Sequence, residues 1–304
     1  MLGYYQMFYG GFLLLVSLTS CVTRNTSKIL SAEENPALKG LWPRIEETDV
    51  LIIGELHDNP YHHRLQGEII AKIAQKKRLG AVLFEQLDAR QEPQLKGLTS
   101  GDLNRLPSLI QWDQSGWHDF ELYRPVFAAA LEAGVPILAA NFPQEKTREI
   151  YQRGLEALFS AEDLKASGLK TAFSGEILAA LRDDIYEGHC RMMPRDHTDK
   201  MIPIQRARDA HMALALRKAP QSKIAVYIVG NGHARKDFGI PWYLGQMNPR
   251  LKVVSIGLLE ESASDPNPTP QVYDFTLLTP AATRQDPCEE LARNLRQAPK
   301  HSKP

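Results

Sequence analysis

The sequence predicts an α/β protein in which helices cover both faces of a largely parallel central sheet, with a helical cap added to it. Short, continuous runs of β-branched and aliphatic residues alternate along the chain with segments of helical periodicity. Runs of this kind are typical of parallel strands that are buried on both faces. Their alternation with helices is the pattern of a sheet that is covered on each side.

The elements can be assigned in order from local signals. Asn59 followed by Pro60 predicts a helix start, because Asn caps helices well and Pro suits the first helical position. The mostly helical segment 143–219 is expected to form the cap. The full expected order is strand 49–53, helix 60–77, strand 80–85, helix 119–133, strand 135–140, the cap, strand 223–229, strand 251–257 and an edge strand within 271–278.

The chain is expected to hold one domain with short flanking segments. The predicted order is a signal peptide at 1–20, a linker at 21–40, the domain at 41–284 and a tail at 285–304. An apolar stretch, 8–18, is too short to span a bilayer as a helix and leads into Leu18-Thr19-Ser20-Cys21, which resembles a bacterial lipobox. This resemblance implies a lipid on Cys21 and an anchor in the bacterial outer membrane, since Val22 and not Asp follows.

Composition excludes one class of partner. Acidic and basic residues are equal in number, at 36 each, and 43% of the 304 residues are hydrophobic. Nucleic-acid binding requires a concentrated positive surface. The compact basic run Lys76-Lys77-Arg78 stands at the end of an expected helix, where it complements the helix dipole. We therefore expect a globular protein that does not bind nucleic acid.

The pattern G-x-x-H occurs twice, as Gly54-Glu55-Leu56-His57 and Gly230-Asn231-Gly232-His233. Each copy directly follows an expected buried strand. In open α/β sheets, ligands bind where the turns after the carboxyl ends of the strands converge. The two histidines are therefore predicted to share one site.

Further polar residues are expected at the same edge of the sheet. Asp58, His62 and His63 follow the first motif closely, and Glu85 and Asn141 each end an expected strand. Imidazole nitrogens and carboxylate oxygens in such a mixture suit borderline and hard metal ions. A late helix of the cap presents Gln205, Arg208 and Asp209 on one face.

These motifs resemble those of the ChaN-like haem-binding lipoproteins, which belong with the Tiki proteins and the erythromycin esterases. Beside the paired G-x-x-H motifs, the resemblance rests on an ordered set of segments over roughly 48–256. They are Phe84-Glu85-Gln86-Leu87 with Gln91, Tyr123-Arg124-Pro125, Ala139-Ala140-Asn141-Phe142-Pro143, His189-Cys190, Gln205-Arg206-Ala207-Arg208-Asp209 and Gly230 to Leu244.

The resemblance implies a haem-binding lipoprotein of iron uptake, with haem as its cofactor and a lipid anchor in the membrane. A homodimer and an outer-membrane haem receptor are candidate partners. Glu55, His57, His233 and Tyr123 are the candidate haem or metal ligands, with the other polar residues named above around them. The alternative is a hydrolase that uses a divalent metal such as zinc or manganese, with Glu55 or Glu85 as general base.

Several residues leave two interpretations open. Tyr123, beside Arg124, is either held as a tyrosinate suited to ferric haem or is a packed core residue. Arg208 and Asp209 either form an ion pair that holds the cap helix, or Arg208 binds a haem propionate or substrate carboxylate.

Two interpretations also remain open for the cysteines. Once Cys21 carries lipid, an oxidising compartment would allow Cys190 and Cys288 to pair. Otherwise both stay as thiols, and Cys190 beside His189 could serve as a soft ligand of haem or metal.

Overall fold

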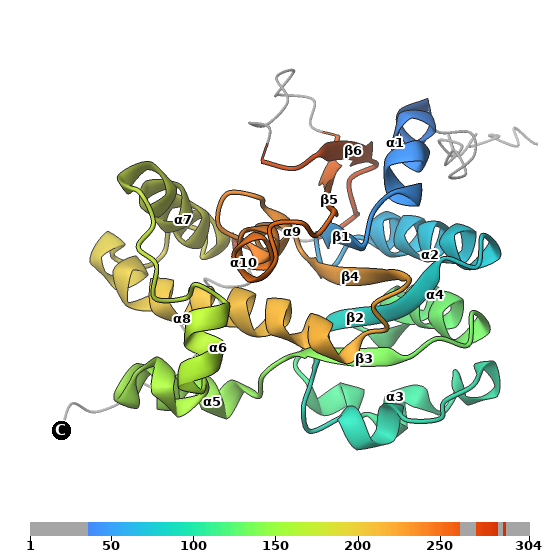
Figure 1. The fold of residues 1–304 in the computed structure, drawn as a ribbon, viewed down its shortest axis with the longest axis horizontal. Helices are drawn as coiled ribbons and strands as arrows, with labels where there is room; N and C mark the ends of the chain where they lie inside the picture. Colours follow the sequence, from blue (N-terminus) through green and yellow to red (C-terminus); the bar gives the residue numbers. More distant parts are fainter. Residues whose placement is uncertain (1–35, 262–271, 285–287, 290–304) are drawn as a thin grey trace, which may run out of the picture. The chain divides into compact units, whose positions relative to one another are not determined.

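A computed structural model describes residues 36–261, 272–284 and 288–289 of the chain (Figure 1). Its strands are β1 Val50–Glu55, β2 Leu79–Asp88, β3 Ile137–Asn141, β4 Ile224–Gly230, β5 Val253–Glu260 and β6 Phe275–Thr279. Its α-helices are α1 Pro36–Glu46, α2 Pro60–Gln75, α3 Leu106–Leu109, α4 Phe120–Glu132, α5 Gln144–Arg153, α6 Ala161–Ala166, α7 Gly175–Gly188, α8 Arg195–Ala215, α9 Asn231–Ala234 and α10 Ile240–Met247. The signal peptide and lipobox predicted at the N-terminus lie outside the described residues.

The six strands form one sheet in the order β3-β2-β4-β1-β5-β6, and every neighbouring pair is parallel. The predicted parallel α/β sheet is confirmed, and β6 is the edge strand expected within 271–278. After β1 the chain moves toward one edge of the sheet, and after β4 it moves toward the other. The adjacent ends of β1 and β4 therefore mark the point where ligands bind in sheets of this type.

Helices cover both faces of the sheet because successive strand residues point to opposite sides. On one face, Leu51 and Ile53 of β1 pack with α2 and α4, which contribute Ile69 and Phe127. On the other face, Ile52 packs with the long helix α8. Figure 1 shows α2 and α4 on one side of the strands and α8 and α10 on the other. Burial of each large side chain of this kind contributes about 1.5–3 kcal/mol.

Helix α2 begins where the sequence predicted. The side-chain oxygen of Asn59 accepts hydrogen bonds from the backbone N–H groups of Tyr61 at 2.8 Å and His62 at 3.3 Å. Pro60 is the first helical residue. The cap fixes the point at which the chain turns from β1 into α2, and it thereby brings the first turn of α2 back against the end of β1.

The segment 143–219, predicted as a helical cap, contains α5, α6, α7 and α8. Its longest helix, α8, packs directly on the sheet through Ala207, Ala210 and Ala213, which are fully buried. Helix α7 packs in turn against α8. This segment therefore covers one face of the sheet as well as reaching toward its carboxyl edge.

Cys190 and Cys288 form a disulfide, with 5.3 Å between their Cα atoms. Pairing is thus the interpretation that holds, and Cys190 is not available as a soft thiolate ligand. The bond joins the end of α7 to a residue 98 positions later in the chain. None of the helices within the described ranges has both the length and the apolar character needed to cross a membrane.

Candidate functional site

The two G-x-x-H turns meet at the carboxyl edge, where Glu55 lies opposite Gly230 in the register of β1 and β4. The glycines allow this approach. A Cβ on Gly54 would lie 2.5 Å from Oδ1 of Asn231, and a Cβ on Gly230 would lie 2.8 Å from Nε2 of His57. The glycine of each motif thus makes room for a side chain of the other, so the two motifs form a single site.

Glu55 is the centre of the first half of this site. Its carboxylate is buried, and Oε1 lies 2.9 Å from Nδ1 of His57. The same oxygen accepts hydrogen bonds from Nε2 of Gln86 at 3.0 Å and from the hydroxyl of Tyr123 at 3.0 Å. Three groups from different elements are therefore fixed around one oxygen atom.

The second oxygen of Glu55 faces helix α2. Oε2 accepts a hydrogen bond from Nε2 of Gln66 at 2.7 Å and lies 3.3 Å from Nδ1 of His63. Burial alone would raise the pKa of this carboxyl group. The charges and hydrogen bonds of His63 and His57 outweigh burial and hold the pKa well below its ordinary value. Glu55 is therefore an ionised carboxylate at neutral pH, with both oxygens occupied.

His57 is the partly open residue of the set. Its side chain is 31% exposed, and its ring packs edge-on against the indole of Trp117, with 4.9 Å between ring centroids. While Nδ1 is held by Glu55, no hydrogen bond to Nε2 is found among the described residues. His57 therefore presents one oriented imidazole whose Nε2 has no hydrogen-bond partner among the described residues.

His233 forms the second half of the site and is more enclosed. Its Nδ1 lies 2.7 Å from Oδ1 of Asp209 and its Nε2 lies 3.2 Å from Oε1 of Glu85. Gln205 also reaches Nδ1, at 3.2 Å. Burial would lower the pKa of His233, but the two carboxylates raise it to about 10. His233 is thus an imidazolium held between two acids, and neither of its nitrogens is directed toward an open position.

The two carboxylates beside His233 differ in their own environment. Glu85 also accepts the backbone N–H of Gly230 at 2.7 Å, and His233 lowers its pKa to about 2 against the effect of burial. Burial raises the pKa of Asp209 to about 6, and its Oδ2 has no hydrogen-bond partner among the described residues. Asp209 therefore pairs with His233 and not with Arg208, which corrects the ion pair considered from the sequence.

Tyr123 is a buried hydrogen-bond donor. Beside the bond to Glu55, its ring packs on His63 with 4.2 Å between centroids. Burial and the Glu55 charge raise its pKa well above the ordinary value, so the hydroxyl keeps its proton. Arg124 points elsewhere and pairs with Glu121 at 2.6 Å. Of the two interpretations of Tyr123, the structure favours the packed tyrosine, which positions Glu55.

Three other predicted residues lie outside this network. Asp58 forms an ion pair with Arg284 at 2.5 Å. His62 is fully buried, and its Nδ1 accepts the backbone N–H of Leu56 at 2.9 Å. Nδ1 of His189 lies 2.7 Å from the carbonyl oxygen of Ile185 at the end of α7. These side chains hold local structure and do not face His57.

A cavity of about 500 Å³ opens beside Trp117 at the ends of β2 and β3. Asn141 and Arg208 both line it, and Nη1 of Arg208 donates a hydrogen bond to Oδ1 of Asn141 at 3.2 Å. Arg208 forms no ion pair with a carboxylate among the described residues. Its guanidinium therefore supplies positive charge to the cavity wall.

The arrangement limits what the site can do chemically. Within the described part of the chain, no group of three or more His, Cys, Asp or Glu side chains is placed to hold a metal ion. The oxygens of Glu55 are all occupied by donors, and those of Glu85 face Gly230 and His233. Neither carboxylate is thus directed at an open position as a general base would be.

Sequence reasoning assigned no role to Gln66 or to Gln86, the two amides that hold Glu55, although Gln86 lies within one of the recognised motifs. Gln66 stands three residues after His63, and this helical spacing was a usable signal. Gln86 directly follows Glu85 in β2, so it points to the opposite face of the sheet. Its role could be recognised only once β2 was known to lie near β1.

Fold and site together define an α/β protein with a buried histidine–carboxylate cluster at the switch point of a parallel sheet. The chain belongs to the family described as haem-binding uptake, Tiki superfamily, ChaN, whose model matches residues 41–244. That match covers both G-x-x-H motifs and all the residues of the Glu55 and His233 networks.

Comparison with the solved structure of one ChaN protein shows the same fold. ChaN of Campylobacter jejuni, whose structure is described as showing cofacial haem binding, is 20% identical, with a TM-score of 0.60. The match covers 78% of this chain and 91% of that one. A mutant erythromycin esterase EreC in its open conformation is 14% identical, with a TM-score of 0.43, over 81% and 80% of the two chains. A search of curated proteins finds no match.

Proposed function

We propose that this chain binds haem at the carboxyl edge of the sheet, with Nε2 of His57 as the ligand of the iron. The family to which the chain belongs supports haem as the ligand. The observation that carries the assignment to His57 is its oriented and partly exposed imidazole, which has Glu55 on Nδ1 and no partner for Nε2 among the described residues.

The residues around His57 fit this ligand. A histidine whose second nitrogen is held by a carboxylate is fixed in orientation and becomes a more basic ligand. Imidazole is a common axial ligand of haem iron. The indole of Trp117 offers an aromatic surface for the macrocycle, and Arg208 in the adjoining cavity can bind a propionate. When bound, the haem would supply an iron centre, and the protein would supply its orientation.

The hydrolase alternative has less support. It requires a divalent metal such as zinc or manganese and a carboxylate that is free to take a proton from water. In the site as described, both oxygens of Glu55 are occupied, and Glu85 is paired with His233. Elemental analysis of the purified protein distinguishes the two functions directly.

The test is an absorption titration of the purified protein with haemin. We expect a saturable Soret band at one haem per chain, and we expect His57→Ala to lose most of it. His118→Ala, at an exposed histidine, serves as the matched control. Equal haemin binding by parent and His57→Ala would overturn the ligand assignment. Absence of any Soret band, with zinc or manganese present, would overturn haem binding itself.

The cofacial haem binding described for ChaN of Campylobacter jejuni suggests a further part of the proposal. If two chains bring their haems face to face, haemin should convert this chain from monomer to dimer as the Soret band saturates. Analytical ultracentrifugation with and without haemin measures this change. If the haem-loaded protein stays monomeric, the proposed homodimer is contradicted, while the proposed haem binding is not.

We also propose that Cys21 carries the lipid anchor and that the protein acts in iron uptake at the outer membrane, beside a haem receptor. The lipobox Leu18-Thr19-Ser20-Cys21 supports this, and it lies outside the described residues. Cys21→Ser should abolish labelling by a clickable palmitate and leave an unprocessed precursor. Unchanged labelling and unchanged membrane fractionation would count against the anchor.

A further inference from the structure

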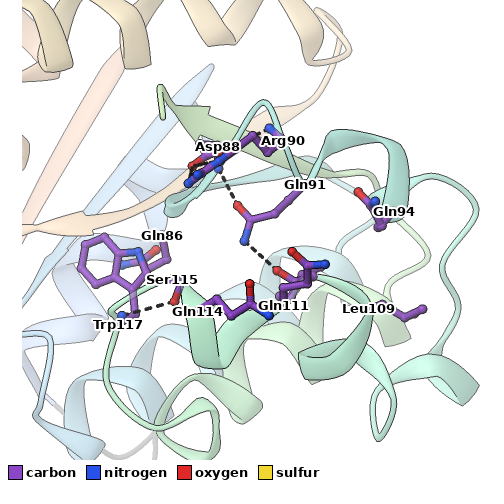
Figure 2. A pocket seen from close by; sticks show the side chains of 11 residues that line it. Gln86, Asp88, Arg90, Gln91, Gln94, Leu109, Gln111, Gln114, Ser115 and Trp117 are labelled. Atoms are coloured by element: carbon purple, nitrogen blue, oxygen red, sulfur yellow. Dashed lines mark hydrogen bonds and ion pairs between the residues drawn. The ribbon is translucent and has the colours of Figure 1, made fainter. Parts of the chain in front are cut away.

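A second, smaller cleft lies next to Trp117, on the side of the loops that follow β2 (Figure 2). Its volume is about 150 Å³. The lining side chains used below are Gln86, Asp88, Arg90, Gln111, Gln114 and Trp117. Figure 2 shows the glutamines arrayed along this cleft, with Trp117 at one end. We call it the glutamine cleft.

The carboxamide of Gln86, a residue that lines this cleft, has an unused acceptor. Gln86 is 2% exposed, and its Nε2 donates to the ionised carboxylate of Glu55. Because the nitrogen must face the carboxylate, the oxygen must face away from it. This Oε1 has no hydrogen-bond partner in the described structure. A buried acceptor left unpaired costs free energy, so the position favours a ligand that brings an O–H or N–H group.

The other glutamines offer further hydrogen bonds. The side chains of Gln111 and Gln114 are exposed, and no hydrogen bond of theirs is found within the described ranges. Each carboxamide provides an acceptor oxygen and two donor hydrogens at neutral charge. A hydroxyl group is likewise both donor and acceptor, so a row of carboxamides matches a row of hydroxyls.

Charge excludes an ionic ligand as the best fit. The carboxylate of Asp88 accepts three hydrogen bonds from the Arg90 guanidinium, at 3.0 and 3.2 Å from Nε and at 2.7 Å from Nη2. The remaining arm of this guanidinium pairs with Glu145 at 3.0 Å. Asp88 and Arg90, the charged residues that line the cleft, compensate each other, and an ion entering it would find no unpaired opposite charge.

Trp117 adds an aromatic surface to these polar walls. Its indole is only partly buried, and its ring edge already contacts His57. A sugar ring combines hydroxyl groups at its rim with C–H groups on its face, so it can satisfy carboxamides and an indole at the same time. We propose that the glutamine cleft binds one neutral sugar unit, stacked on Trp117 and hydrogen-bonded by Gln86, Gln111 and Gln114.

This inference goes beyond haem binding: it shares Trp117 and Gln86 with the surroundings of the proposed haem site and adds Gln111 and Gln114. Gln111 and Gln114 make no contact with Glu55 or His57 in any hydrogen bond, ion pair or ring contact of the described residues. The cleft adjoins the larger cavity beside Arg208, because the two share Gln86, Asp88, Arg90, Gln114, Ser115 and Trp117 in their walls. A bound sugar would thus lie beside the haem site and share the indole of Trp117 with it.

The test uses the haem-free full chain and three probes, namely glucose, galactose and N-acetylglucosamine. Isothermal titration and saturation-transfer NMR measure binding of each sugar. A single sugar unit buries few atoms, so we expect at least one probe to bind with a Kd on the order of 1 mM. Gln114→Ala should weaken that probe roughly fivefold, the usual effect of one lost hydrogen bond, and Gln111→Ala should act similarly.

Controls separate this site from general effects. Gln221→Ala removes an exposed glutamine before β4, at the opposite edge of the sheet, and should leave sugar binding unchanged. The haemin titration curve of Gln114→Ala should be the same as that of the parent. This expectation holds even if the parent does not bind haemin. Failure of all three sugars to bind the parent would overturn the inference, and so would equal binding by the parent, Gln114→Ala and Trp117→Ala.

Discussion

Acidification should destabilise the protein through His62, a residue that also holds the first G-x-x-H turn. The side chain is fully buried, and its Nδ1 accepts the backbone N–H of Leu56 at 2.9 Å. Its Nε2 has no hydrogen-bond partner among the described residues. Protonation of Nδ1 would break the bond to Leu56 and leave a buried charge. Burial accordingly lowers the pKa of His62 from 6.5 to about 4.

The size and sign of the effect follow from this pKa. The unfolded chain takes up the proton at higher pH than the folded chain. The contribution of His62 to the free energy of unfolding is therefore fully present above pH 6.5 and falls as the pH approaches 4. The difference between the ordinary and the folded pKa of His62 corresponds to about 3.4 kcal/mol, of which about 2.5 kcal/mol is lost between pH 7 and 4.5. This loss is a large part of the stability of an ordinary domain, which is about 5–15 kcal/mol.

The variant His62→Asn isolates the contribution of His62 protonation to the free energy of unfolding. The Asn oxygen can replace Nδ1 as acceptor for Leu56, but it does not titrate. Urea denaturation at pH 7 and at pH 4.5 gives the stability difference between parent and variant, in which the other titrating groups cancel. We expect that difference to shift by about 2.5 kcal/mol in favour of the variant at the lower pH.

Two further histidines serve as controls. His211 also has a pKa lowered to about 4 by burial, so His211→Asn should give a similar shift from another part of the fold. His118 is exposed, so His118→Asn should give none. A stability difference between parent and His62→Asn that stays constant from pH 7 to 4.5 would refute the reasoning.

Three other changes test the site and the fold. Glu55→Gln replaces a carboxylate that has five contacts by an amide. It should weaken haemin binding about ten- to a hundredfold, the usual effect of losing a partner that orients a ligand. An unchanged Soret titration would contradict this. Arg208→Gln should weaken haemin binding by about ten- to a hundredfold. It should leave the binding of haemin dimethyl ester unaffected, since only the free acid can form the ion pair. Equal loss of affinity for both compounds would exclude a propionate contact. Cys190→Ser with Cys288→Ser should lower the free energy of unfolding by about 2–5 kcal/mol in urea denaturation, and a loss much smaller than this would mean that the bond adds little stability.

The strands and the position of the site could be predicted because both depend on local patterns. Each buried strand is a continuous apolar run, and in a parallel sheet all carboxyl ends meet at one edge. That reasoning placed His57, Glu85, Asn141 and His233 together, and the structure has them at that edge. The Asn59 cap was equally local and was also found as predicted.

The partners of individual side chains could not be predicted in the same way. Consecutive residues on a helix point about 100° apart, so Arg208 and Asp209 contact different groups although they are neighbours in sequence. The same geometry turns Arg124 toward Glu121 while Tyr123 is buried against Glu55. Which group each side chain meets depends on the packing of distant elements, and no pattern along one helix contains that information.

The disulfide between Cys190 and Cys288 affects how the protein must be prepared for any haem measurement. Protein made in a reducing cytosol would carry Cys190 and Cys288 as thiols, and Cys190 stands directly beside His189 in the sequence. A thiolate binds ferric haem well. Such a preparation could give a Soret band from this second position and hide the loss expected for His57→Ala. Material folded under oxidising conditions, with its thiols counted before titration, avoids this false signal, so the redox history of the sample decides what the spectrum reports.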